Sequence, residues 1–265
     1  MLKDITLGQY FPGDTPVHRL DPRTKLILVV LYIIALFQAK NWPSYLLLIL
    51  VTAVCMAVSH ISPKNIFKGL KPMLFVIALT ALLNLFYTQG TPVREGWPIT
   101  WEGIDRAVKM MLRITLLITG TFLLTYTTSP MSLTDGLESL LRPLKKLKVP
   151  VHEMTLMMSM ALRFIPTLIE ETDKIMSAQK ARGADFETGN LLQRARALLP
   201  ILVPLFVSSF RRADELAIAM ESRCYHGGEG RTRMTRLKYG KNDYIALFLG
   251  LLLLVAVNVM RHYGL

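Results

Sequence analysis

The sequence predicts an all-α integral membrane protein with about five transmembrane helices and three further helices on the cytoplasmic side. Apolar residues make up 52% of the 265 residues and charged residues only 19%, and the mean hydropathy is +0.37. The apolar residues fall in long blocks, and most Lys and Arg residues fall between those blocks. This composition excludes a disordered chain, and a count of two cysteines excludes a small domain held together by disulfides.

Five apolar blocks predict the transmembrane helices, because a helix of roughly 17–25 residues crosses the hydrocarbon layer. The first block is short, but Asp21 is suited to cap a helix with Pro22 at its first position, which supplies the missing length. A secretory signal peptide is the competing explanation of this block, but a long polar stretch precedes it and no small-residue cleavage site follows it. The blocks are residues 26–39, 44–60, 72–88, 108–128 and 244–260.

Loops that are rich in Lys and Arg alternate along the chain with loops that are poor in them. Residues 1–25 contain four, 40–43 one, 61–71 three and 89–107 two, whereas 129–242 contain eighteen of the 31. The positive-inside rule therefore places the N-terminus and the 129–242 region in the cytoplasm and the C-terminus outside. Topology thus accounts for most of the net charge of +12, and nucleic acid is not an expected partner because no nucleic-acid-binding motif accompanies the basic residues.

Residues 129–242 predict three partly apolar helices rather than a linker or a typical soluble domain. The first, over 132–148, begins with a Ser-x-x-Asp capping pattern, has a leucine stripe and ends in lysines, so we expect a kinked helix at the membrane interface. The second and third, over about 151–182 and 190–223, each pass from an apolar to a polar half. The prolines expected inside these helices are Pro143, Pro200 and Pro204.

The second and third of these helices end alike, in a small residue, an arginine and another small residue. An arginine is favoured there because the last turn of a helix leaves carbonyls unpaired and carries partial negative charge. A thin helical tip with one guanidinium is suited to enter a groove on another protein and pair with a carboxylate; an ordinary helix cap with a solvated arginine is the alternative. The candidate partner-binding residues are Ala181, Arg182, Gly183, Ser222, Arg223 and Cys224.

Five segments carry a likeness to a known family: residues 8–10, 18–26, 162–166, 181–183 and 222–224. With them the chain resembles, over essentially its whole length, the transmembrane T component (EcfT/CbiQ family) of energy-coupling factor (ECF) transporters, which are ABC transporters. The last segment departs from the Ala-Arg-Gly pattern in having Ser222 and Cys224, but both residues are small, so the arginine is expected to keep its role. Cys224 is less suited than glycine to end a helix, and the glycines that follow, at 227 and 228, are the alternative terminators.

The resemblance implies a non-catalytic scaffold subunit. Members of the family assemble with two ABC-type ATPase subunits and one small membrane substrate-binding (S) subunit, and each coupling helix inserts its arginine tip into a groove on one ATPase. ATP-driven closure of the ATPases then moves the coupling helices and reorients the S subunit for uptake of vitamins or other micronutrients. The resemblance also implies a place in the bacterial plasma membrane, no cofactor on this chain, and ATP with Mg²⁺ on the partner subunits.

The sequence also predicts the domain organisation and leaves two other functions open. We expect an N-terminal four-helix transmembrane part (1–128), a cytoplasmic coupling-helix region (129–242), and the last transmembrane helix with its tail (243–265). The chain has no G-x-x-x-x-G-K-[ST] phosphate cradle, so ATP is expected on a partner. An integral membrane enzyme would need convergent titratable groups. A stand-alone secondary transporter would need polar groups near the bilayer midplane.

Two groups of charged residues have ordinary interpretations. The carboxylates Glu170, Glu171 and Asp173 lie within the second central helix without a histidine at ligand spacing, so we interpret them as a solvated face and expect no metal site. Arg113 lies inside the fourth apolar block, and we expect its long side chain to extend to the nearer membrane interface.

Overall fold

The computed structural model describes residues 10–92, 99–184, 186, 190–227 and 237–263. Within these residues the chain is helical, and its only β-pairing is an isolated bridge between Pro92 and Thr100. The predicted all-α fold is therefore confirmed. The chain divides into two units: a larger unit, Gly8–Leu140 with Leu237–Leu265, and a central unit, Leu141–Arg236.

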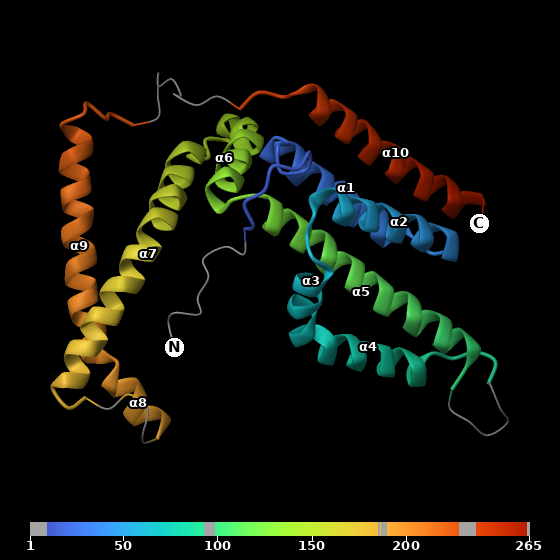
Figure 1. The fold of residues 1–265 in the computed structure, drawn as a ribbon, viewed down its shortest axis with the longest axis horizontal. Helices are drawn as coiled ribbons and strands as arrows, with labels where there is room; N and C mark the ends of the chain where they lie inside the picture. The colour runs from blue at the N-terminus through green and yellow to red at the C-terminus, as the bar shows by residue number, and fades with distance from the viewer. Residues whose placement is uncertain (1–9, 93–98, 185, 187–189, 228–236, 264–265) are drawn as a thin grey trace. The chain divides into compact units, whose positions relative to one another are not determined.

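The larger unit contains seven α-helices among the described residues, most of them apolar; their arrangement is drawn in Figure 1. They are α1 (Pro22–Gln38), α2 (Trp42–Ser59), α3 (Pro63–Leu70), α4 (Leu74–Tyr87), α5 (Trp101–Thr127), α6 (Pro130–Leu141) and α10 (Lys241–Tyr263). Helix α1 packs against α10 and α5, and α5 also packs against α4 and α2. Helices α1 and α5 thus hold the unit together, and a short 3₁₀ turn joins α3 to α4.

Four segments of the described chain are long and apolar enough to cross a membrane: α2, the continuous stretch Pro63–Tyr87, α5 and α10. They correspond to four of the five predicted blocks, to within one residue at the end of each block. The fifth is α1, whose 17 residues reach the lower end of the spanning range of roughly 17–25 residues. Its predicted start is confirmed, because the Asp21 side chain accepts a hydrogen bond from the Arg23 amide and Pro22 occupies the first turn.

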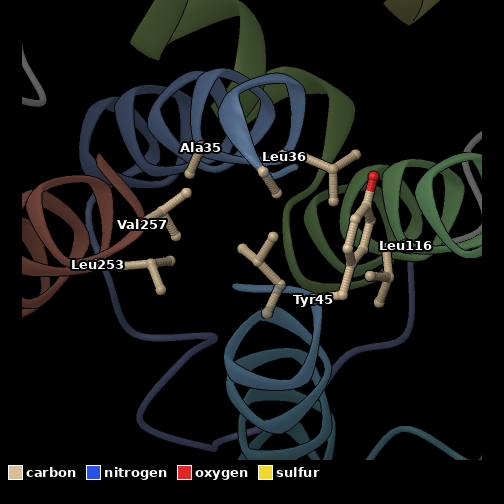
Figure 2. Close-up of a cluster of buried hydrophobic side chains, with 8 residues drawn as sticks. Ala35, Leu36, Tyr45, Leu116, Leu253 and Val257 are labelled. Atoms are coloured by element: carbon tan, nitrogen blue, oxygen red, sulfur yellow. The ribbon is translucent and has the colours of Figure 1, made fainter. Parts of the chain in front are cut away.

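The core of the larger unit lies where α1, α2, α5 and α10 meet (Figure 2). Leu36 and Val257 are completely buried, and Tyr45 is 1% exposed. Helices α1 and α10 approach closely because α10 has a glycine at the contact: a Cβ at Gly250 would lie 2.5 Å from Cδ2 of Leu28. The buried members of this cluster are Ala35, Leu36, Ala39, Tyr45, Leu48, Leu116, Leu253 and Val257.

The outer surface of the larger unit is apolar. Large side chains such as Leu46, Phe75 and Phe248 are 64–74% exposed, and similar residues recur along α2, α4 and α10. Such a surface is unfavourable in water and is suited to contact lipid chains. A bilayer also requires that every backbone N–H and C=O group be hydrogen-bonded within the protein, and an α-helix meets this requirement internally.

Arg113 has a more specific position than the sequence indicated. Its Nη2 donates a hydrogen bond of 2.9 Å to the carbonyl of Ala39, which ends α1. The guanidinium carbon lies 5.9 Å from the ring centroids of both Phe37 and Tyr45. Arg113 of α5 therefore caps the negative end of α1, where we had expected it only to reach the membrane interface.

The first predicted central helix differs from the structure at both ends. It was expected over 132–148, but α6 begins at Pro130, because Ser129 is the capping residue: its Oγ accepts a 3.2 Å hydrogen bond from the amide of Ser132. The regular α-helix ends at Leu141, and Arg142–Leu147 continues as a 3₁₀ segment, η3. This change agrees with the kink expected at Pro143, whose ring removes one amide donor and clashes with the preceding turn.

The central unit contains η3 and the helices α7 (Val151–Ala181), α8 (Leu191–Ala197) and α9 (Leu199–Glu221). The prediction of one helix over 190–223 was wrong, because the helix is interrupted at Leu198. Pro200 stands in the first turn of α9 rather than inside a longer helix. In that turn its missing amide needs no partner, whereas in the middle of a helix it would leave a carbonyl unpaired. Pro204 does lie inside α9.

Candidate functional site

Helix α7 ends as its sequence predicts. Gly183 has φ +89°, and its amide donates to the carbonyl of Lys180 at 3.0 Å, while the amide of Ala184 donates to the carbonyl of Gln179 at 3.0 Å. These two bonds form a Schellman motif, which satisfies the last carbonyls of the helix. A Cβ on Gly183 would meet no atom within 4 Å, so the backbone conformation, not lack of space, favours glycine here.

Helix α9 ends with the same two bonds, although no glycine closes it. The amide of Cys224 donates to the carbonyl of Glu221 at 2.8 Å, and the amide of Tyr225 donates to the carbonyl of Met220 at 3.0 Å. Cys224 itself takes the left-handed conformation, with φ +56°. The alternative that the glycines at 227 and 228 close the helix is therefore wrong. A cysteine in this conformation carries a backbone strain of roughly 1–2 kcal/mol.

Both tips are open to contact. Ala181, Arg182 and Gly183 are all exposed, and so are Ser222, Arg223 and Cys224. Neither Arg182 nor Arg223 forms an ion pair with another residue in the described ranges. Each guanidinium thus remains accessible at the end of a helix, where the unpaired carbonyls favour a positive charge.

The two tips lie at opposite ends of an antiparallel helix pair. Helices α7 and α9 pack against each other (Figure 1). Gln179, near the end of α7, donates from its Nε2 to the carbonyl of Pro200 at the start of α9 at 3.3 Å. Because α9 has 23 residues, it extends about 34 Å from there to its own end. Arg182 and Arg223 are therefore separated by roughly the length of α9.

An ion pair fixes the middle of this helix pair. Nη2 of Arg212 lies 2.8 Å from Oε2 of Glu171. A hydrogen bond with Ser208 and the charge of Arg212 lower the pKa of Glu171. Glu171 was interpreted as part of a solvated face; the structure corrects this, because the partly exposed carboxylate is paired with Arg212 of α9, 41 positions further along the chain.

The central unit also exposes apolar side chains. On α7, three of the methionines in the Met-rich segment are 43–61% exposed: Met154, Met157 and Met158. On α9, Val203, Phe206, Val207 and Phe210 are 56–69% exposed. Methionine is unbranched and flexible, so such a surface adapts to partners of different shape.

The described residues contain no group of three or more His, Cys, Asp or Glu side chains placed to hold a metal ion. Cys55 and Cys224 are both free thiols. What the geometry does offer is two separate, exposed, positively charged helix ends on one pair of packed helices, beside an exposed apolar surface.

Comparison with known proteins covers almost the whole chain. A family model described as cobalt transport protein (CbiQ) matches residues 13–234, which include both helix tips. The energy-coupling factor transporter transmembrane protein EcfT of Ruminiclostridium cellulolyticum is 50% identical over 265 residues, 99% of each chain. The proteins of the same name from Clostridium kluyveri and Heliobacterium modesticaldum are 53% and 54% identical over 98% and 92% of this chain, and over 97% and 92% of their own.

Proposed function

This chain belongs to the family of transmembrane proteins of energy-coupling factor transporters, and we propose that it transmits the motion of two partner ATPases to a substrate-binding membrane subunit. As a member of that family it is a multi-pass membrane component of an ECF transporter. In this proposal it catalyses no reaction itself and binds no cofactor, and ATP with Mg²⁺ is held by the two ABC-type ATPases.

The observation that carries the proposal is the pair of exposed arginine tips. Each tip ends its own helix, and because α7 and α9 are antiparallel the two tips lie at opposite ends of the helix pair. A guanidinium on a narrow helix end forms two parallel hydrogen bonds with a carboxylate, which gives both strength and orientation. The separation of roughly 34 Å along α9 suits one tip for each of two ATPases rather than both for one. Movement of one ATPase relative to the other would then load both ends of a single helix pair.

The exposed apolar surface of α7 and α9 supports a second contact, with the small membrane substrate-binding (S) subunit. We propose that this subunit selects the vitamin or other micronutrient, and that the present chain is indifferent to which one is transported. The distribution of Lys and Arg supports a topology with the N-terminus and the central unit in the cytoplasm of a bacterium and the C-terminus outside.

Charge reversal at the two tips tests the proposal. We expect Arg182→Glu and Arg223→Glu each to weaken co-purification with the ATPases by roughly tenfold or more, because each places a like charge against an acidic groove. The double variant should abolish uptake in reconstituted vesicles, yet remain inserted in the membrane, since both residues are exposed.

Arg211→Glu is the matched control, because Arg211 is an exposed arginine within α9 and away from either tip. It should leave assembly and uptake at the level of the unaltered protein. Normal uptake by the double variant would contradict the proposal. So would an equal loss in the Arg211→Glu control, since that loss would come from net charge rather than from the tips.

A further inference from the structure

Arg23, in the first turn of α1, touches both places where the chain passes between its two units. The chain enters the central unit after Leu140 and returns to the larger unit at Leu237. Just before the first passage, Ser139 accepts a 3.3 Å hydrogen bond from Nη1 of Arg23. Just after the second, Tyr239 lies under the guanidinium, whose carbon is 4.0 Å from the ring centroid. One side chain thus joins the two connections.

Arg23 is held in that position by Asp21. The carboxylate accepts from Nε at 3.0 Å and from Nη2 at 2.8 Å, and also from the Arg23 amide at 2.9 Å. Both side chains are largely buried, with 13% and 3% of their surface exposed. A guanidinium paired in this two-bond geometry has a fixed plane, so its remaining nitrogen and its face are aimed at Ser139 and Tyr239.

A second buried carboxylate ties α10 to the same point. Oδ1 of Asp243, in the first turn of α10, accepts from the amide of Asp21 at 2.8 Å, and its Oδ2 accepts from the amide of Gly240 at 2.7 Å. Asp243 is only 4% exposed. The start of α10 is therefore bonded directly to the start of α1, in addition to the contact through Tyr239.

The end of α5 and the middle of α6 are fixed there as well. Nζ of Lys25 donates to the carbonyl of Thr127 at 2.8 Å and to that of His18 at 3.1 Å. The backbone of α6 lies against α1, because a Cβ at Gly136 would be 2.9 Å from Cβ of Pro22. We call the side chains that make these ties the polar clasp: Asp21, Arg23, Lys25, Ser139, Tyr239 and Asp243.

We propose that the polar clasp is a mechanical joint, in which Arg23 is a positioning residue that keeps both connections of the central unit in register with α1. Displacement of α7 and α9 then moves α6, α10 and α1 as one body instead of being absorbed in two independent linkers. Buried charged hydrogen bonds suit this task, because they are directional and breaking one leaves an unpaired charge. The mechanical role rests on the proposed function, whereas the joint itself does not.

The test replaces Arg23 in the complete complex with its ATPases and S subunit. We expect Arg23→Met to leave the complex assembled and ATP hydrolysis within about twofold of normal, and to lower uptake per ATP by roughly fivefold or more. Tyr239→Leu removes only the stacking partner and should lower the same ratio with a smaller risk of misfolding. Arg19→Met is the matched control, because Arg19 is 70% exposed and pairs only loosely, at 3.8 Å, with exposed Asp14.

Hydrogen exchange separates the joint from the transport function. In detergent, Arg23→Met should speed amide exchange in both α6 and residues 237–243, whether or not partners are bound, and Arg19→Met should speed neither. Unchanged exchange in both segments, or unchanged uptake per ATP in an assembled Arg23→Met complex, would overturn the proposal that the polar clasp is a mechanical joint. So would a parallel fall of assembly, hydrolysis and uptake in both Arg23→Met and Tyr239→Leu, which would mean a purely structural role. If the unaltered chain binds no ATPase, the proposed function fails, and the exchange result still decides the joint.

Discussion

At the scale of single residues, the two helix tips differ at the residue that closes each helix. Gly183 and Cys224 both have positive φ, +89° and +56°, and both donate the same backbone hydrogen bond of the Schellman motif. Glycine takes this conformation freely, whereas a cysteine in it is strained by roughly 1–2 kcal/mol. The end of α9 is therefore the less stable of the two tips.

This difference predicts opposite effects for substitutions at equivalent positions. Cys224→Gly should stabilise the end of α9 by about 1 kcal/mol, because it removes the strain of a left-handed side-chain-bearing residue. Gly183→Val should destabilise the end of α7 by a similar or larger amount, since a β-branched residue is strongly disfavoured there. Thermal unfolding in detergent measures both, and equal, unchanged midpoints would show that φ at these positions does not limit stability.

Arg113 carries a second prediction at this scale. Replacing it by Met should destabilise the protein by roughly 1–3 kcal/mol, because the last carbonyl of α1 loses its charged donor. The matched control is Arg106→Met, since Arg106 is an exposed arginine of the same helix and should change stability by less than about 0.5 kcal/mol. Denaturant unfolding of both variants in the same detergent makes the comparison. Equal losses in the free energy of unfolding would contradict the role of Arg113 as a cap of α1.

At the scale of helices, α7 and α9 are packed together and linked by an ion pair and by hydrogen bonds. Glu171, Ser208 and Arg212 meet at the centre, and Gln179 bonds to Pro200 at one end. The ion pair is partly exposed, with 34% and 21% of the two side chains accessible, so it is better suited to fix the crossing than to supply much stability.

The Glu171 contacts predict a dependence on pH. Its pKa is lowered in the folded protein, first by the hydrogen bond with Ser208 and then by Arg212. The carboxylate therefore contributes stability above the unfolded pKa of about 4.3, and this contribution is lost as pH falls through the lower folded pKa. Glu171→Gln should be less stable than the unaltered protein at pH 7 and equally stable at low pH.

Glu170→Gln is the control for that experiment, because Glu170 is the exposed neighbour of Glu171 in the same helix. Unfolding midpoints are measured from about pH 7 down to about pH 3. The difference in midpoint between Glu170→Gln and the unaltered protein should stay the same over this range. A constant difference between Glu171→Gln and the unaltered protein over the whole range would contradict the assigned interaction.

Individual helices were predictable where the cause is local. The start of α1 follows from Asp21 and Pro22, and the end of α7 follows from Gly183, because caps depend on residues a few positions apart. Two boundaries were predicted wrongly for equally local reasons. Ser129 was overlooked as the cap of α6 because Ser132 also fits a capping pattern, and Pro200 was placed inside a helix that it starts.

At the scale of the whole molecule, the apolar blocks and alternating charges predicted the membrane class, because each block carries its own signal. Contacts between distant residues were not predictable from these patterns. Neither the antiparallel pairing that separates Arg182 from Arg223 nor the meeting of Asp21 with Asp243, 222 positions apart, leaves a periodic trace in the sequence. The candidate tips could thus be named, but their separation required the structure.

In the proposed function each tip contacts a different ATPase subunit, and cross-linking of the assembled complex tests this arrangement. A photoreactive amino acid introduced at position 181, at position 222, or at both would be activated after purification with both ATPases and the S subunit. We predict one ATPase joined to the chain in each single variant and two in the double variant. Cross-links only to lipid or to the S subunit, or a double variant that never carries more than one ATPase, would contradict the assignment of one ATPase to each tip.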